Sequence, residues 1–321
     1  MAPLSAASAA TLKPCSNDVY LAHLDEDWVV RNVPNGGYAL GVIAQACIVH
    51  QATSNLPSPL HVVAHYLNPT MVGAAEIHLR VVKQGKNFVN IVAELEQEGS
   101  LRITSHLIFA RSTLSTYPLK APAPGTRFGR LIPLRTHPTS MVATSLADEY
   151  PWFAFSTHAH WAMDSSFAEP AGSNGFTQWG AWLELKGPSE RITLSSLALL
   201  ADCFLNLARL WPREVTGGLG WQPTLALNLE WKHPIPEPSE KHAARTVGIY
   251  VVSGYLGAPQ SRHDTFVEIW TAPAGIAETK PIRERWREEQ VCLGIASQMQ
   301  LIMNTGRTRN FKRPANEITK L

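Results

Sequence analysis

Apolar positions along this chain follow two different periods, separated by turn signals. Residues 36–53 (GGYALGVIAQACIVHQAT) have helical apolar spacing; they follow a turn signal at Pro34-Asn35-Gly36-Gly37 and end before the breaker-rich SNLPSP. The period then becomes that of strands, which we expect at 60–67, 75–84, 87–97 and 101–110, after a leading strand or two within 19–32. The pattern predicts one antiparallel layer wrapped on a single helix.

The second half of the chain repeats this order. A helix is predicted at 194–212, and strands are predicted at 151–163, 176–185, 224–234, 244–253, 264–272 and 289–303. LHVVAHYLNP, which begins at Leu60, aligns with LALNLEWKHP, which begins at Leu225, at an offset of 165 residues. We interpret this as a duplicated α+β unit, whose two copies pack as a pseudo-dimer with their sheets joined edge to edge.

These patterns divide the chain into five parts. We expect a disordered lead at 1–17, an N-terminal unit at 18–111, a linker or insert at 112–150, a C-terminal unit at 151–305 and a basic tail at 306–321. The linker is dense in Pro, Ser and Thr, so it is predicted to lack a core of its own.

Charge and cysteine content narrow the classes of function. A formal net charge of +2 with 17% charged residues argues against a nucleic-acid groove or a polybasic membrane arm, because both need clustered positive charge. The partner is therefore expected to be a small molecule. The widely separated cysteines indicate a reducing compartment, with neither a disulfide framework nor a metal site: Cys15, Cys47, Cys203 and Cys292.

The sequence also bears on location. The best membrane candidate, residues 194–211, is interrupted by Asp202, Asn206 and Arg209, so no membrane span is predicted. The N-terminus lacks a basic segment and a continuous apolar core, which disfavours a secretory signal and favours a cytoplasmic protein. The last three residues, Thr319 to Leu321, resemble a peroxisomal address of the Ser-Lys-Leu type except for their Thr, which leaves a peroxisomal location as the alternative.

A long central helix wrapped in an antiparallel sheet is the hotdog architecture. The duplicated form resembles the double-hotdog acyl-CoA thioesterases, the group that includes bacterial thioesterase II. PNGGYALG (34–41) resembles the family's helix entry, LHVVAHYLNP with residues 81–99 resembles its first-domain strands, and TLALNLEWKHP resembles its second-domain strand. The resemblance implies a double hotdog in one chain, with two antiparallel sheets that each wrap a central helix.

The family's chemistry implies a water-binding trio in this chain. Carried over by position, it falls on Asp202 in LALLADCFL, on Thr224 in QPTLALNLEWKHP and on Gln300 in IASQMQ. Helical spacing independently places Asp202 on an apolar surface, where an ionised carboxylate needs partners. Because Thr224 and Gln300 are neutral, they can hold a carboxylate and a water without fixing the pKa of the carboxylate low, as an Arg would.

The implied reaction is hydrolysis of a thioester with Asp202 as general base. The developing oxyanion would be met by backbone N–H groups at a helix N-terminus, around Gly36, Gly37 and Tyr38. The counterpart of Asp202 in the first helix is expected to be Gln45, which is uncharged, so one carboxylate site per chain is predicted.

The stretch from 152 to 182 is rich in aromatic residues. It predicts either ordinary core packing or the wall of an acyl pocket, for which Trp161, Trp179 and Trp182 are the candidates. No G-x-S-x-G elbow is present, which leaves a serine-free, water-based reaction with neither metal nor cofactor as the consistent option.

Three functions stay open at this point. The first is an acyl-CoA thioesterase-like hydrolase that acts on acyl-CoA or on an acyl chain carried by phosphopantetheine. The second is the same pocket used for dehydration, isomerisation or cyclisation of a specialised metabolite, and the third is non-catalytic acyl binding. Whether the chain stands alone or forms a homo-oligomer is also open.

Overall fold

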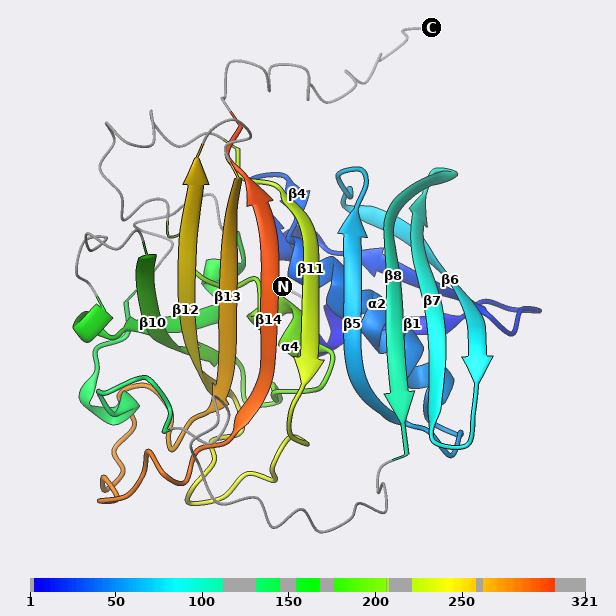
Figure 1. The fold of residues 1–321 in the computed structure, drawn as a ribbon. Coiled ribbons are helices and arrows are strands. Elements are labelled where there is room, and N and C mark those ends of the chain that lie inside the picture. The colour runs from blue at the N-terminus through cyan, green and yellow to red at the C-terminus, as the bar shows by residue number, and fades with distance from the viewer. Residues whose placement is uncertain are drawn as a thin grey trace, which may run out of the picture.

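Twelve antiparallel strands form one continuous sheet in this computed structural model, which describes residues 3–111, 131–144, 154–167, 176–205, 207, 221–257 and 262–303 (Figure 1). The order across the sheet is β1-β2-β6-β7-β8-β5-β11-β14-β13-β12-β10-β9. In the first half the strands are β1 (Ala10–Leu12), β2 (Val19–Leu24), β5 (Ser58–Tyr66), β6 (Gly73–Gln84), β7 (Phe88–Gln97) and β8 (Ser100–Ala110). In the second half they are β9 (Ala159–Met163), β10 (Phe176–Leu185), β11 (Thr224–Trp231), β12 (Thr246–Gly257), β13 (Arg262–Thr271) and β14 (Cys292–Leu301).

The two sheets expected from the sequence are therefore joined into one. The junction is the antiparallel pair β5–β11, which occupies the edge that each half would otherwise expose. Outward from the junction, each half continues with its own antiparallel strands: β8, β7, β6 and β2 on one side, and β14, β13, β12 and β10 on the other.

The register of the junction is symmetric. Asn228 lies opposite Val63, and these two residues are 165 positions apart, which is the offset of the aligned strands. The flanking pairs follow the same rule. Ala226 lies opposite His65, and the positions that correspond to these two at the offset of 165 are His61 and Glu230, which also lie opposite each other. The two strands thus meet at corresponding positions.

Two helices lie on the face of the sheet that is turned away from the viewer in Figure 1, and we call it the inner face. α2 (Gly36–Gln51) is almost entirely buried there, and α4 (Ser196–Leu200) packs beside it. The strands' inner-face residues join both helices in one core that includes Ile91, Leu107, Leu229, Val267 and Ile269. The prediction at 36–53 is confirmed within two residues.

The second helix is shorter than expected. It begins after reciprocal hydrogen bonds between Thr193 and Ser196, and it ends at Leu200 in a turn in which the Asp202 N–H donates to Leu199 O at 2.9 Å. Asp202 therefore lies in the turn after α4, not inside a helix. The predicted helix residues 206 and 208–212 lie outside the described part.

The expected disordered lead is wrong from residue 3 onward. Residues Leu4–Ala7 form the short helix α1, and β1 pairs with β2. Leu4 is only 3% exposed, and its N–H donates to Glu190 Oε1 at 2.8 Å. Apolar residues spaced three apart at Leu4, Ala7 and Ala10 are enough to anchor this segment on the core, a signal that the Ala/Ser-rich composition concealed.

A second, smaller core covers the opposite, outer face of the C-terminal half. Residues 131–144, within the predicted linker, contribute Ile132 and Leu134, and the segment after β13 contributes Trp286. These pack on the outer-face side chains Ala162, Trp182, Tyr250, Trp270, Ala272, Cys292 and Ile295.

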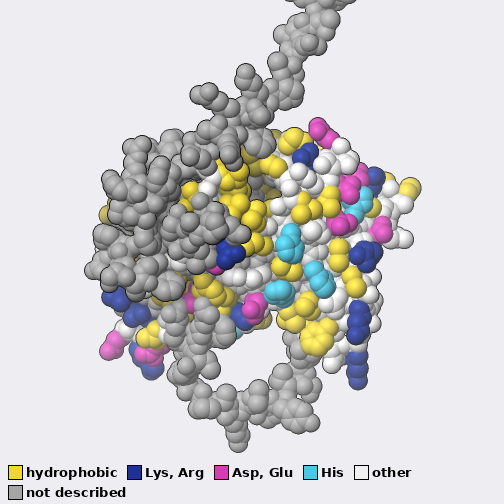
Figure 2. Space-filling view, turned by 45° about the horizontal axis from the view of Figure 1, so that its top comes forward, with side chains coloured by type: hydrophobic (Ala, Val, Ile, Leu, Met, Phe, Trp, Pro, Cys, Tyr) yellow, Lys and Arg dark blue, Asp and Glu magenta, His cyan; other side chains and the backbone are white. Residues whose placement is uncertain are grey.

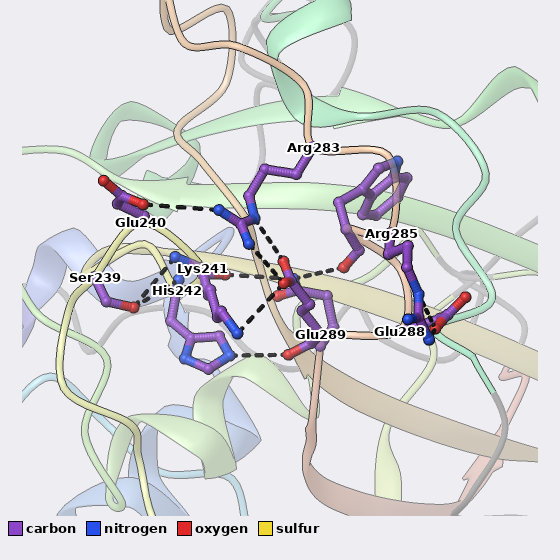
Figure 3. Close-up of polar contacts among 10 residues, drawn as sticks. Ser239, Glu240, Lys241, His242, Arg283, Arg285, Glu288 and Glu289 are labelled. Atoms are coloured by element: carbon purple, nitrogen blue, oxygen red, sulfur yellow. Dashed lines mark hydrogen bonds and ion pairs between the residues drawn. The ribbon is translucent and has the colours of Figure 1, made fainter.

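Ion pairs hold the segment that carries Trp286 in place (Figure 3). The Arg283 guanidinium donates to both carboxylate oxygens of Glu289, at 2.8 and 2.9 Å, and Lys241 Nζ lies 3.3 Å from Glu289 Oε1. These cations, Arg283 foremost, lower the pKa of Glu289 to about 2. The segment around Ser239–His242 is thereby tied to residues 283–289.

The remaining described elements are short. They are η1 (Glu26–Trp28), β3 (Val29–Val30), β4 (Val33–Pro34), η2 (Pro138–Ser140), η3 (Ala154–His158) and η4 (Ser165–Phe167). Within the described ranges, none of the helices is long and apolar enough to span a bilayer. The predicted basic tail and the C-terminal tripeptide both begin after residue 303, so they lie outside the described residues.

Candidate active site

The N-terminus of α2 is the centre of the site. Asn35 caps the helix, since its Oδ1 accepts from the Tyr38 N–H at 2.9 Å. The next free donor, the Gly37 N–H, donates to Asp202 Oδ2 at 2.9 Å. A carboxylate at this position also faces the positive end of the helix dipole.

Glycine at positions 36 and 37 allows this approach. A Cβ on Gly37 would lie 2.4 Å from Ala198 O and 2.5 Å from Asp202 Cβ, closer than real Cβ atoms come. A Cβ on Gly36 would lie 3.3 Å from Asp202 Oδ2. The turn after α4 can reach the first turn of α2 because Gly37 has no side chain, and a side chain at Gly36 would crowd the Asp202 carboxylate.

Burial and hydrogen bonds have opposite effects on the pKa of Asp202. Burial raises the pKa of Asp202 from 3.8 to about 6, while hydrogen bonds from the Gly37 N–H and from the side chains of Gln298 and Asn35 act in the opposite direction. No cation appears among these causes. The carboxylate is therefore charged at neutral pH, yet it is basic enough to accept a proton from water.

Two glutamines and a threonine lie beside it on neighbouring strands. Thr224 is the register partner of Gln300 across β11 and β14. Gln300 Nε2 donates to Gln298 Oε1 at 2.5 Å and to Thr224 Oγ1 at 3.4 Å. Gln298 Nε2 in turn donates to Ala201 O at 2.8 Å.

Gln298 is thus the glutamine next to Asp202, and the sequence analysis missed it. Thr224 and Gln300 connect to Asp202 through Gln298, which supplies one of the hydrogen bonds that lower the pKa of Asp202. The signal was present, because residues two apart on a strand point to the same face, and Gln298 and Gln300 are two apart.

Tyr66 and Asn35 were also missed. The Tyr66 hydroxyl donates to Gly36 O at 2.9 Å, and burial together with the charge of Asp202 raises the pKa of Tyr66 well above its usual value. Asn35 could have been found from the sequence, since Asn before a glycine-rich helix start is a preferred cap. Tyr66 ends an ordinary strand, and nothing in its local sequence distinguishes it.

The expected oxyanion donors are mostly engaged. The Tyr38 N–H is capped by Asn35 and the Gly37 N–H is bonded to Asp202, while no partner for the Gly36 N–H is found within the described part of the chain. The Tyr38 side chain is fully buried, and its hydroxyl donates to Ala7 O at 2.7 Å. The prediction for Tyr38 is corrected to a structural one, because both its amide and its hydroxyl already have partners.

The three tryptophans do not share one wall. Trp161 and Trp179 are on the inner face with ring centroids 5.9 Å apart. Trp182 belongs to the outer core, where its Nε1 donates to Thr136 O at 2.9 Å. Because side chains alternate along β10, Trp179 and Trp182 must point to opposite faces. Trp182 is therefore removed from the predicted acyl pocket.

Gln45 is not the counterpart of Asp202. The residue 165 positions before Asp202 is Gly37, which is the residue that Asp202 contacts, whereas Gln45 lies in the middle of α2. The contact joins corresponding places of the two halves, as the pair Val63–Asn228 does in the sheet.

Another hollow lies away from this site. A cavity of about 790 Å³ opens on the outer face, and its lining includes Val252, Phe266 and Met299. Hydrophobic side chains gather on this side of the molecule (Figure 2). The Asp202 carboxylate is on the other face of the sheet, and Gln298 and Thr265 of the two strands between them also line the cavity. Over the described ranges, no group of three His, Cys, Asp or Glu side chains could hold a metal ion.

Comparisons with known proteins point to one fold. Residues 24–113 match the family model of the acyl-CoA thioesterase N-terminal domain. No curated protein sequence matches the chain. Among solved structures, a hot dog fold protein of unknown function from Alicyclobacillus acidocaldarius has a TM-score of 0.68 at 14% identity, covering 94% of this chain and 98% of that one.

Two further structures carry thioesterase names. A protein assigned as a thioesterase II from Thermobifida fusca YX has a TM-score of 0.66 at 20% identity, covering 95% of this chain and 98% of that one. The acyl-CoA thioesterase II TesB2 from Mycobacterium marinum has a TM-score of 0.64 at 12% identity, covering 97% and 99%. At such identities these likenesses establish the hotdog fold, and the family match adds the thioesterase-type domain.

Proposed function

We propose that this chain, an acyl-CoA thioesterase-like hydrolase with the family's N-terminal domain at residues 24–113, hydrolyses an acyl thioester with a water activated by Asp202. The observation that supports it most is the position of that carboxylate. It is placed between an amide of the first helix and Gln298 of the last strand, with a pKa raised to about 6 and no cation to neutralise it.

The proposed step needs no other reactant. Asp202 takes a proton from water while the water oxygen bonds to the thioester carbonyl carbon, and the carbonyl π electrons move to its oxygen. The Gly36 N–H, at the positive end of α2, donates to this oxyanion. The intermediate collapses, the C–S bond breaks, and the thiolate takes the proton back from Asp202. Thr224 and Gln300 orient the water.

We propose a double hotdog, a pseudo-dimer in one chain, as the architecture behind this site. The symmetric register of β5 and β11 supports it, and so does the contact between Gly37 and Asp202 at the same offset of 165 residues. Each half then supplies what the other lacks: the first half gives the helix N-terminus, and the second gives the base and the glutamines. The acyl group would arrive on CoA or on a carrier's phosphopantetheine.

The test is release of free thiol from a panel of acyl-CoAs. Asp202→Asn is expected to lower kcat by at least about 100-fold, the scale of general-base loss, while the circular dichroism spectrum stays unchanged. Asp264→Asn is the matched control, because Asp264 is exposed and faces away from the site. Equal turnover by Asp202→Asn and the unmodified protein would exclude Asp202 as the base. Binding of acyl-CoA without any cleavage would favour non-catalytic binding or another reaction in the same pocket.

A further inference from the structure

The inner face beside the two glutamines is polar where a hydrophobic core would be expected. Cross-strand register places His263 directly opposite Gln300, and Thr265 directly opposite Gln298. Ser253 lies opposite Thr265 on the next strand. None of these five side chains is more than 4% exposed. Residues directly opposite each other on one face have Cβ atoms about 5 Å apart, so His263 and Thr265 adjoin the proposed site.

Two atoms of this group have no partner. His263 Nε2 and Thr265 Oγ1 are buried without a hydrogen bond among the described residues. The same holds for Nε1 of Trp161 and of Trp179, which lie on the same face. A buried polar group without a hydrogen bond is destabilising, and native proteins pair nearly all of them. Four on one face of one half are explained if a ligand pairs with them.

The hydrogen bonds of His263 define what its free nitrogen can do. Ser253 Oγ donates its single proton to Asp264 O at 3.1 Å. His263 Nδ1 lies 3.4 Å from Ser253 Oγ and must be the donor to it, because Ser253 has no second proton to give. Burial lowers the pKa of His263 to about 4, so the ring is neutral at pH 7 and holds one proton. Nε2 is therefore an acceptor to which no described group donates.

The inner face of the N-terminal half differs in this respect. The unpaired buried atoms of its strand β8, Arg102 Nε and His106 Nε2, belong to side chains that alternate with the inner-face residues and point to the other face. Ser105, buried on the inner face of β8, donates to Ala93 O at 2.8 Å. Gln97, buried on β7, donates to Met71 O and Ala74 O and accepts from the Met71 N–H. The polar groups of these two inner-face side chains are satisfied within the protein.

We propose that the substrate's acyl chain carries hydroxyl groups, and that His263 and Thr265 are specificity-determining residues that recognise a hydroxyl near the thioester. This inference rests on the proposed hydrolase function. A hydroxyl can donate to His263 Nε2 and accept from Thr265 Oγ1, whereas a plain alkyl chain leaves both unpaired, and a keto oxygen cannot pair with Nε2. The indole N–H groups of Trp161 and Trp179 suit a further oxygen on the chain, beside an apolar ring surface.

The experiment compares hexanoyl-CoA with 3-hydroxyhexanoyl-CoA and 5-hydroxyhexanoyl-CoA, which have the same chain length. One hydrogen bond to an otherwise unpaired buried group changes transition-state binding by about tenfold or more. At least one hydroxylated substrate is therefore expected to exceed hexanoyl-CoA in kcat/KM by that factor. Equal or better cleavage of hexanoyl-CoA would overturn the inference.

Variants locate the effect. Thr265→Val and His263→Phe are expected to reduce the hydroxyl preference at least fivefold, while Ser105→Ala, in the other half, keeps it. Without ligand, Thr265→Val should not lower the melting temperature, because it removes an unpaired polar group. A lower melting temperature together with an equal loss for all three substrates would assign Thr265 a structural role.

A binding measurement separates this inference from the proposed hydrolysis. Calorimetric titration of the Asp202→Asn protein with the same three compounds measures recognition without turnover. Tighter binding of a hydroxylated compound supports the inference even if no thioester is ever cleaved. Identical binding of all three overturns it even if hydrolysis is observed.

Discussion

Asp202 combines two opposing influences on one carboxyl group. Burial favours the protonated form, while the Gly37 N–H and the Gln298 and Asn35 side chains favour the charged form. An arginine in place of these neutral partners would hold the pKa of Asp202 low and make it a poor base. The balance is what a general base at neutral pH requires.

The pH dependence of catalysis follows from this balance. Because the base must be deprotonated, kcat/KM is expected to be level above pH 6 and to fall about tenfold per unit below the Asp202 pKa of about 6. Stability should change in the opposite sense. The folded-state pKa exceeds the unfolded value of 3.8, so the contribution of Asp202 is largest below pH 3.8 and is lost as pH rises to 6. A pH–rate profile with constant kcat/KM from pH 4 to 8 would contradict the assignment.

Gln298 should act through Asp202. In Gln298→Met the carboxylate loses a donor, so its pKa rises, and the acid limb of the pH–rate profile should move to higher pH along with a decrease in kcat. Ser297→Ala is the matched control, since Ser297 points to the outer face, where it accepts from Asn228. A fall in kcat with no movement of the limb would mean that Gln298 only supports packing.

The sequence suggests which residues form the proposed trio, but not how they connect. Thr224 and Gln300 lie opposite each other as a strand pair, a register that the sequence analysis did not predict. Gln298 stands between them and Asp202 because the turn after α4 lies against β14 at this residue, and local sequence does not report such a tertiary contact.

At the scale of elements, α2 and the turn after α4 are fitted to each other. Strand positions were predicted well because apolar residues alternate with polar ones along a strand that has one buried face. The length of α4 was not predicted, since LALLADCFLNLARLW is apolar and favours a helix throughout. The turn at Asp202 is instead stabilised by the hydrogen bond between Asp202 and the Gly37 N–H. Tertiary contact here overrides local propensity.

Gly37→Ala tests this fit. The added Cβ would lie 2.4 Å from a backbone oxygen, so α2 and the α4 turn must separate, at a cost of about 3 kcal/mol. Chemical denaturation should show that loss, and thiol release should fall as Asp202 moves. Gly85→Ala is the control, because its Cβ would approach an atom only to 3.4 Å. Similar stability of the two variants would refute the close fit.

At the scale of the molecule, the pairing of β5 with β11 determines how the halves depend on each other. The fragment 1–111 would leave β5 as an open edge. Since the junction is centred on Val63, β5 of one fragment can pair with β5 of another in the same antiparallel register. We therefore expect the fragment to be a dimer by light scattering, and the same fragment with Ala64→Pro to lose that dimer. A folded monomer would show that the edge needs no partner.

The contact between Gly37 and Asp202 has a consequence for how such a site could arise. Residues at corresponding places meet there, so an assembly of two identical subunits would bring together either two carboxylates, which repel, or two glycines, which offer no base. In the proposed double hotdog, the two copies are in one chain and can differ, so that one keeps a glycine amide and the other has an acid. The proposed catalysis therefore needs a chain whose two halves differ at this position.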